Sequence, residues 1–299
     1  MTTISKFSGF RNDVAEDRFE LGDFAVCNNV DLDETGRVTK RAGLVQLHAG
    51  NYTCVVKHRG FTYAVLNGEL GVVGVTFTPL TTVSTTVCYE AVDDQLYWVA
   101  GNQHGILCAG ELFEWKAHRA SAETVVNPLN IDMAPKQGLM EPPIASKLML
   151  YNGRMYFACG EFLMYSEPYD YGYLEPENFI ALGAPITTMG YVKTGMYIGT
   201  TQESLYLAGA DADSLEMKIV ASKALDGAYS YIPGQSLPEK LRVDYPVPVW
   251  ATSQGIIAGL SDGQIINLTV DRLVFPASSK GVLSYRVCSG TPQLVFAIN

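Results

Sequence analysis

The chain has 299 residues, of which 47% are hydrophobic, 11% aromatic and 17% charged, and its formal net charge is −10. This composition lacks the charge-rich signature of disorder and supplies ample material for a large core. The length fits two average domains or one large all-β domain. Because neutralising phosphates requires clustered Lys and Arg, and the chain has no basic cluster, the sequence argues against a general nucleic-acid binder.

The N-terminus does not have the pattern of a signal peptide. Residues 1–6, MTTISK, contain no apolar stretch of the required length, and no segment approaches the roughly 20 apolar residues that span a bilayer. The sequence therefore predicts a protein that is made and kept in the cytosol and has no membrane anchor.

The first element in chain order is an N-terminal arm, residues 1–23. Residues 10–20 within it have the pattern of either a two-turn helix or a loop. Residues 24–32 and 37–44 then form two strand patterns around residues 33–36, a turn sequence in which glycine supplies the positive φ. We expect a β-hairpin here.

A two-strand pattern recurs six times along the rest of the chain. Each copy has a short apolar strand, a tight polar or glycine turn, and a strand rich in aromatic and β-branched residues. The copies lie at residues 54–65, 89–99, 148–158, 189–199, 248–259 and 283–297. The Asn152-Gly153 turn of the third copy is the strongest short hairpin signal. A further turn and a third strand follow most copies, which indicates a meander.

Meandering antiparallel units repeated about every 35 to 60 residues are typical of propeller blades, because one blade cannot bury both of its faces without neighbours. The last unit has about two strands before the chain ends, so its outer strands must come from the N-terminal hairpin. The sequence therefore predicts a single all-β domain over residues 1–299. We expect a six-bladed β-propeller whose closing blade is shared between N- and C-terminal strands.

Two longer inserted loops interrupt the repeat, residues 124–146, rich in Pro and Met, and residues 165–185, rich in Tyr, Pro and Glu. Tyrosine is over-represented at interfaces because it offers a large, rigid and amphipathic contact area. The candidates for a partner interface are Tyr165, Tyr169, Tyr171, Tyr173 and Phe179, with Phe7 and Phe10 in the arm. The alternatives are that the tyrosines cover the rim of their own blade and that the arm only leads into the closing blade.

The runs NNVD at residues 28–31 and KRAG at residues 40–43 are the first of several motifs in the chain. These motifs resemble those of virion β-propeller proteins of tailed bacteriophages. The opening resembles the start of that family, with NNVD at residues 28–31, TGR at 35–37 and KRAG at 40–43. The run GRMYFACG at residues 153–160, followed by YSEP at 165–168, resembles the family's run of glycine, arginine, hydrophobic residue and tyrosine that leads to Y-S-E-P. The GMYIGT strand that begins at Gly195 is similar to another of its segments.

The resemblance implies a structural protein of the virion tail. In short-tailed phages, such propellers are similar to the proteins of the nozzle or hub, where an oligomeric ring surrounds the DNA exit channel. The resemblance implies a homo-oligomeric ring, with a hexamer favoured, partners among the other tail proteins (adaptor, fibre or spike), and genomic DNA only in passing. It implies assembly in the host cytoplasm and location in the virion. Larger nozzle proteins are longer than this chain, so an extra tube-forming domain is not implied.

An enzymatic propeller would need carboxylates from several blades to converge. The candidates are Asp31, Asp93, Asp94, Glu161, Glu203 and Asp262. Most lie in predicted turns, where aspartate favours hydrogen bonds to the local backbone. We therefore predict no catalytic residues and no enzyme. The alternative function is a propeller that binds or cleaves glycans on host surface polysaccharide.

The sequence also lacks the spacing of known metal and cofactor sites. Its four histidines show no H-x-x-H pattern, and its six cysteines include no close pair, which predicts reduced cysteines that serve as small core residues. No phosphate-binding loop, dinucleotide fingerprint or nucleophile elbow occurs. We predict neither a metal nor a cofactor.

Overall fold

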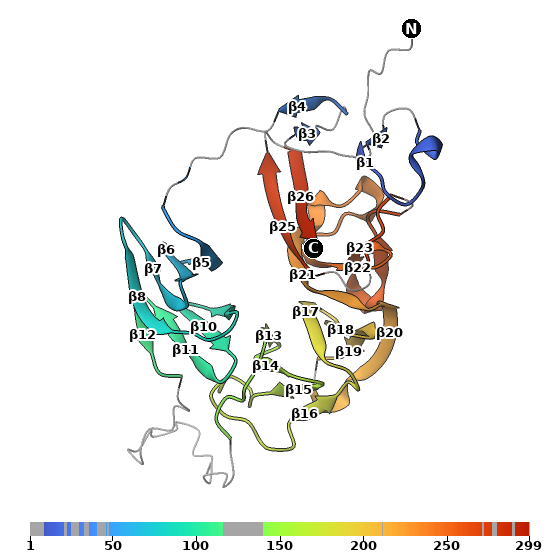
Figure 1. Ribbon diagram of the computed structural model, residues 1–299. Coiled ribbons are helices and arrows are strands. Elements are labelled where there is room, and N and C mark those ends of the chain that lie inside the picture. Colours follow the sequence, from blue (N-terminus) through green and yellow to red (C-terminus); the bar gives the residue numbers. More distant parts are fainter. Residues whose placement is uncertain are drawn as a thin grey trace, which may run out of the picture. The chain divides into compact units, whose positions relative to one another are not determined.

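The computed structural model describes most of the chain. The described residues are 9–20, 23–24, 30–32, 36–40, 46, 48–115, 140–210, 212–270, 272–276, 280–288 and 291–298. The chain divides into two compact units, unit 1 with Met1–His48 and Thr187–Asn299, and unit 2 with Ala49–Ile186. The single domain over residues 1–299 stays a prediction, and each unit is described by itself below (Figure 1).

Unit 2 contains three four-stranded sheets, each a meander of strands consecutive in sequence. The first sheet consists of β5 (Tyr52–His58), β6 (Phe61–Leu66), β7 (Glu69–Val73) and β8 (Phe77–Thr82). The second consists of β9 (Cys88–Val92), β10 (Gln95–Ala100), β11 (Gln103–Cys108) and β12 (Glu111–Phe113). The third consists of β13 (Leu148–Tyr151), β14 (Arg154–Cys159), β15 (Phe162–Tyr165) and β16 (Phe179–Ala181).

The hairpin turns of unit 2 follow from their residue types. In the third sheet, Asn152 has a φ of 47° and Gly153 a φ of 78°, the left-handed pair that a two-residue hairpin turn requires. The turn of the first sheet is built in the same way by Arg59 and Gly60, with φ values of 46° and 88°. The first three predicted hairpins are therefore confirmed.

The core of unit 2 lies between its sheets. Because strand side chains alternate between the two faces, Leu96 and Trp98 of β10 pack against the first sheet, whereas Tyr97 and Val99 pack against the third. Both faces of this strand are thus buried, which explains why its sequence, QLYWVA, is apolar over consecutive positions rather than alternating. This pattern is expected of a blade between two others.

Unit 1 contains the two other four-stranded sheets. One consists of β17 (Ile186–Val192, whose first residue belongs to unit 2), β18 (Gly195–Thr200), β19 (Glu203–Ala208) and β20 (Glu216–Ser222). The other consists of β21 (Ala224–Pro233), β22 (Pro246–Thr252), β23 (Gly255–Gly259) and β24 (Ile265–Asn267). The predicted hairpin at residues 248–259 is confirmed as β22–β23, but it forms the second and third strands of its sheet, because β21 precedes it.

Among the described residues, three two-stranded sheets complete unit 1. They are the parallel pair β1 (Gly9–Phe10) and β2 (Asp23–Phe24), the hairpin of β3 (Val30–Leu32) and β4 (Val38–Lys40), and the hairpin of β25 (Gly281–Cys288) and β26 (Thr291–Ile298). The guanidinium of Arg286 on β25 donates to the carboxylate of Asp31 on β3 at 2.6 Å, so the N- and C-terminal hairpins are in contact. The predicted closing blade thus draws on both ends of the chain, but the two hairpins are separate two-stranded sheets, with no strand pairing between them among the described residues.

Helical structure in the described residues is limited to five 3-10 turns. They are Glu16–Arg18, Ala212–Ser214, Gly234–Ser236, Glu239–Leu241 and Ser261–Gly263. The first is all that forms of the two-turn helix considered for residues 10–20, and none of these turns has the length or apolarity of a membrane span. Five four-stranded sheets and the terminal hairpins make this an all-β chain with the fold class predicted, a six-bladed β-propeller.

Candidate interaction surface

The connection from β15 to β16, within the predicted loop 165–185, is tied together by its own polar groups. The hydroxyl of Ser166 accepts a hydrogen bond from the Met155 backbone N–H at 3.0 Å and donates to the Glu167 carbonyl at 2.8 Å. The side-chain amide of Asn178 donates to the Glu167 carboxylate at 3.1 Å. Since Ser166 and Asn178 are buried, these bonds fix the connection to its sheet.

Two of the candidate tyrosines are part of the sheet packing. Tyr165, on β15, is buried, and the guanidinium of Arg154 lies 5.4 Å from its ring centroid. Tyr171 packs edge-to-face on Tyr97 at 5.8 Å, and burial raises the pKa of both phenols, that of Tyr97 to about 12. These two side chains therefore stabilise unit 2. The half-buried Tyr173 accepts a hydrogen bond at its backbone carbonyl from the Glu167 N–H.

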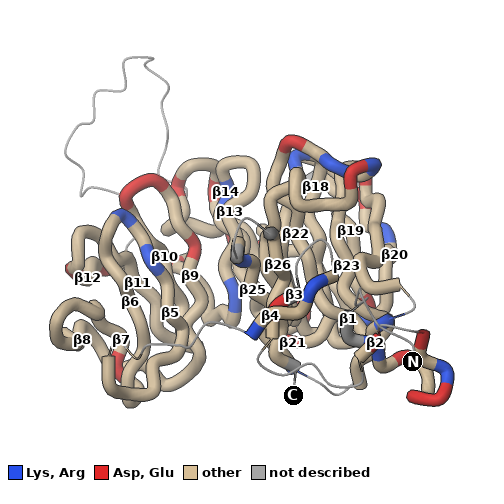
Figure 2. The backbone as a smooth tube through the Cα atoms, turned by 90° about the horizontal axis from the view of Figure 1, so that it is seen from above, with Lys and Arg blue, Asp and Glu red and all other residues tan. Residues whose placement is uncertain are grey.

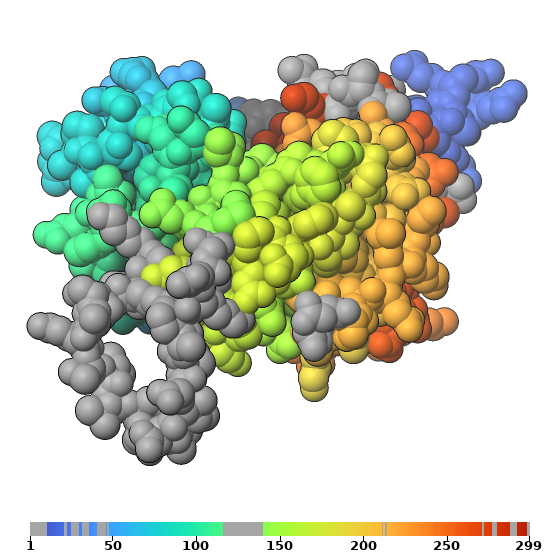
Figure 3. Space-filling model, turned by 90° about the horizontal axis from the view of Figure 1, so that it is seen from below, coloured from blue at the N-terminus to red at the C-terminus, as the bar shows by residue number. Residues whose placement is uncertain are grey.

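The exposed aromatic residues are Tyr169 and Phe179. Tyr169 is 81% exposed, has a φ of 58°, and is held by a 2.6 Å hydrogen bond from its N–H to the Gly153 carbonyl. A Cβ on Gly153 would lie 2.8 Å from the Tyr169 ring, so any other residue here would displace the ring from this position. Phe179 is 46% exposed and meets Phe162 edge-to-face at 5.5 Å. Figure 3 shows this part of the chain, between green and yellow, at the surface.

The other candidate residues and the other insertion are described only in part. Phe7 lies outside the described residues, as does most of the insertion 124–146. Phe10 is placed only as backbone, in β1 opposite Phe24 of β2. The described end of the insertion forms a bridge between Met140 and Leu174, which joins it to the β15–β16 connection.

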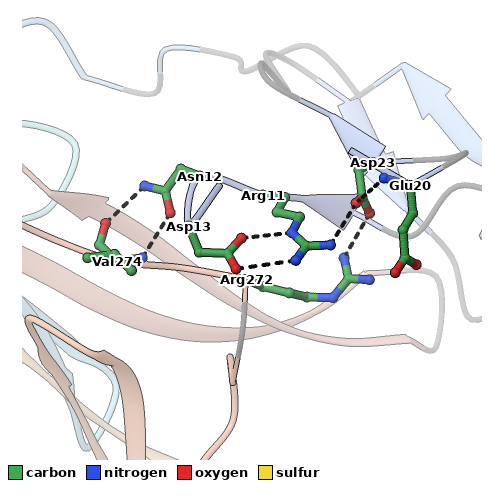
Figure 4. A network of polar contacts seen from close by, with 7 residues as sticks. All are labelled: Arg11, Asn12, Asp13, Glu20, Asp23, Arg272 and Val274. Atoms are coloured by element: carbon green, nitrogen blue, oxygen red, sulfur yellow. Dashed lines mark hydrogen bonds and ion pairs between the residues drawn. The ribbon is translucent and has the colours of Figure 1, made fainter. Parts of the chain in front are cut away.

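The N-terminal segment from Arg11 to Asp23 is held by a charged network, which we call the N-terminal clamp (Figure 4). Arg11 donates to both carboxylate oxygens of Asp13, at 2.7 and 3.3 Å. The fully buried carboxylate of Asp23 accepts from Arg11 at 3.3 Å, from Arg272 at 3.4 Å and from the Glu20 backbone N–H at 3.1 Å. One carboxylate thus links two arginines that are 261 positions apart in the sequence.

Neutral hydrogen bonds extend the clamp. The side-chain amide of Asn12 donates to the Val274 carbonyl at 2.9 Å and accepts from the Val274 N–H at 2.8 Å. The Asn12 backbone N–H donates to the Arg272 carbonyl at 2.9 Å. In the described part of the chain, this segment of the predicted arm is therefore docked on its own unit.

Three of the six acidic residues considered for catalysis have the following polar partners in the structure. Asp94 pairs with Arg59 at 3.0 Å on the surface, Asp31 pairs with Arg286, and the Asp262 N–H donates to the Thr194 hydroxyl at 2.9 Å. Figure 2 shows acidic and basic residues mostly at turns and strand ends. Among the described side chains, no three His, Cys, Asp or Glu residues gather where they could bind a metal ion.

One partly buried acid, Glu90, was not identified from the sequence. It lies on β9, and burial raises the pKa of its carboxyl group to about 7, although a hydrogen bond from the Leu150 backbone opposes the shift. Burial also raises the pKa of the neighbouring Cys88 thiol. The only sequence signal was a charged residue inside a predicted strand. A single partly buried carboxyl next to a thiol whose raised pKa favours its un-ionised form is not by itself a catalytic site.

Comparison with known proteins establishes the fold. No family model matches the chain, and no curated protein matches its sequence. The crystal structure of the N-terminal domain of Nup159, a β-propeller, superimposes with a TM-score of 0.50 at 11% identity, over 83% of this chain and 73% of that one. The extracellular domain of BT4673 from B. thetaiotaomicron also gives a TM-score of 0.50, at 13% identity, over 84% of this chain. This chain spans only 31% of the BT4673 domain, and likeness at such identities concerns fold alone.

Proposed function

We propose that this chain is a structural protein of a bacteriophage tail, a nozzle or hub subunit that forms an oligomeric ring around the DNA exit channel. A hexamer is the favoured ring, its neighbours are other tail proteins, and its place is the virion after assembly in the host cytoplasm. The proposal begins from the motifs that resemble phage virion propellers, and it assigns a role in assembly rather than in catalysis.

The observation that carries the proposal is that one of those motifs orders a segment of backbone next to two exposed aromatic side chains. The motif residues Arg154, Ser166 and Glu167 make the hydrogen bonds that order the β15–β16 connection. The same connection leaves Tyr169 and Phe179 exposed. Binding is favoured when aromatic anchors are held in place before contact, because less conformational entropy is then lost.

The charge of the chain agrees with a DNA conduit. At a net charge of −10, the protein repels phosphate groups, so a duplex can pass without binding. Asp94 and Asp31 are paired with arginines, and the Asp262 backbone N–H is bonded to Thr194. Support for the alternative, a glycan-cleaving propeller, would require convergent carboxylates.

The test measures the mass of the purified chain by light scattering, first alone and then after addition of a lysate that contains the virion proteins. Negative-stain imaging follows. We expect a ring, or recruitment of the chain into one by another tail protein. The double variant Tyr169→Ser, Phe179→Ser should lose recruitment, whereas Val75→Ser, which removes a fully exposed apolar side chain from a turn of the same unit, should retain it. A stable monomer that does not bind virion proteins but binds or cleaves host polysaccharide would contradict the proposal and favour the glycan function.

A further inference from the structure

The outermost strands of the five four-stranded sheets differ in how well their open edges are protected. Strands β12, β16 and β24 have three residues each, and β8 has six residues but carries Pro79 near its centre. Short edges and proline are the usual protection of sheets against pairing with another chain. Strand β20 has seven residues, the sequence EMKIVAS and no proline, and pairs only with β19 among the described strands. It is the longest and least protected of these edges.

The side chains of β20 divide into two faces at its exposed end. Met217 and Ile219, on one face, are 56% and 62% exposed. Glu216 and Lys218, on the other face, are also exposed. Figure 1 shows β20 as the outer strand of its sheet. At this open edge, every second residue directs its backbone N–H and C=O groups away from β19. One face of the strand is apolar, and the other carries alternating charges.

We propose that β20 is a self-association surface, at which it pairs edge to edge and antiparallel with β20 of a second copy of this chain, around a two-fold axis through Met217. In this register Glu216 lies opposite Lys218 of the second copy, and Lys218 lies opposite its Glu216. Met217 lies opposite Met217 of the second copy, on the face of the strands that does not carry Glu216 and Lys218. Each copy thus supplies the charge that the other lacks, as an isologous contact requires.

The charges also select this register. If the axis moved one residue toward the N-terminus, Glu216 would face Glu216 of the second copy. If it moved one residue toward the C-terminus, Lys218 would face Lys218. Like charges directly opposite each other destabilise a strand pair, so both neighbouring registers are disfavoured. Self-pairing centred on Met217 is the arrangement in which charge and apolarity both match.

The contact is short. The register between β19 and β20 is regular from Glu216 to Ile219 and then shifts, which marks a β-bulge that bends the edge. A short contact predicts a dissociation constant of roughly micromolar order. A two-fold contact closes at a dimer, so it is distinct from the head-to-tail contacts of a ring and does not depend on the proposed tail function.

The first experiment measures mass against concentration for the full chain by sedimentation equilibrium. We expect a monomer–dimer equilibrium, which Lys218→Glu weakens by about tenfold or more because both ion pairs become like-charge pairs. The double variant Glu216→Lys, Lys218→Glu exchanges the charges and should restore the dimer. Lys193→Glu, an exposed lysine in the β17–β18 turn, is the matched control and should leave the equilibrium unchanged.

A covalent readout tests the register independently of stability. Opposed strand residues lie close enough for a disulfide, so Met217→Cys should cross-link to its equivalent under mild oxidation with diamide. Ile219→Cys, two residues away, should cross-link far less, and the unsubstituted chain serves as the baseline. A chain that stays monomeric at its highest soluble concentration, or a dimer that responds equally to Lys193→Glu and Lys218→Glu, would overturn the proposal. Neither result would bear on recruitment by virion proteins.

Discussion

Two carboxyl groups in different units meet opposite environments. In unit 1, Asp13 accepts two hydrogen bonds from Arg11, and this pairing lowers its pKa. In unit 2, Glu90 lies on β9, where burial raises its pKa to about 7. Pairing favours the charged form of the first group, whereas loss of water disfavours the charged form of the second. The same chemical group therefore supports one unit and opposes the other at neutral pH.

The comparison predicts opposite pH dependence. The folded pKa of Asp13 lies below its ordinary value of 3.8, so its contribution is present above that value and is lost as the pH falls through the folded pKa. The folded pKa of Glu90 lies above its ordinary value of 4.5, so its contribution is present below 4.5 and is lost as the pH rises to about 7. Mildly acidic conditions therefore favour unit 2 while still retaining the clamp of unit 1.

The largest effect is expected from Asp23→Ala in the N-terminal clamp. The side chain of Asp23 is fully buried, and its carboxylate accepts from two arginines and one backbone N–H, so its removal takes one acceptor from each of these donors. We expect a loss of about 2–4 kcal/mol in the free energy of unfolding of unit 1. Urea denaturation measures the loss, and hydrogen exchange should place it at the amides of residues 11–24.

The control for this prediction is Asp17→Ala, which removes an exposed carboxylate from the 3-10 turn of the same segment. It should change stability by about 0.5 kcal/mol or less. Equal losses from Asp17→Ala and Asp23→Ala would mean that general charge balance, and not the buried ion pairs, holds the N-terminal segment.

The second prediction is a stabilising substitution, Glu90→Gln. Glutamine keeps the shape of the neutral acid but does not ionise, so it removes the cost of a buried charge. We expect unit 2 to gain about 1–3 kcal/mol near pH 8 and to change little near pH 4, where the acid is already protonated. Urea denaturation at both pH values, with the exposed Glu177→Gln as control, makes the test. A gain that is independent of pH would show that burial of the charge is not its cause.

Local patterns in the sequence predicted the blade hairpins. Each strand partner lies a few residues away, and turns such as Asn152-Gly153 carry their own backbone preference, so a short window contains the cause of the structure. Strand β21 was not predicted, because it lacks such a local pattern. Its sequence, ALDGAYSYIP, breaks the alternation, and its pairing with β22 shifts register between Ala224 and Tyr229.

The candidate surface was predicted less well, because exposure depends on distant residues. Composition identified the tyrosines of residues 165–179 but could not separate the exposed Tyr169 from Tyr171, which packs on Tyr97 about 70 positions earlier. The clamp joins residues 11–23 to 272–274, and no local signal marks such a pairing. Glu90 likewise becomes unusual only through burial.

A third prediction separates the neutral part of the clamp from its charged part. Asn12→Ala removes two hydrogen bonds to the backbone of Val274, and we expect a loss of about 1 kcal/mol because the site is partly open to water. No ionisable group is removed, so the loss should be the same at neutral and acidic pH. Denaturation across this range measures it, and a loss that disappears on acidification would mean that Asn12 acts through the neighbouring ion pairs.

The smallest effect is expected from Asp13→Asn, which keeps the shape of the side chain and removes only its charge. Arg11 retains Asp23 as an ionic partner, so the N-terminal segment should stay docked but exchange its amide hydrogens faster near neutral pH. The difference from the unsubstituted chain should vanish as the pH falls through the folded pKa of Asp13, because the native carboxyl is then also neutral. Amide exchange of residues 11–24, corrected for the intrinsic pH effect, follows this change. A difference that persists in acid would assign the role of Asp13 to its shape, and would leave Glu90 as the only one of the two carboxyl groups whose charge affects stability.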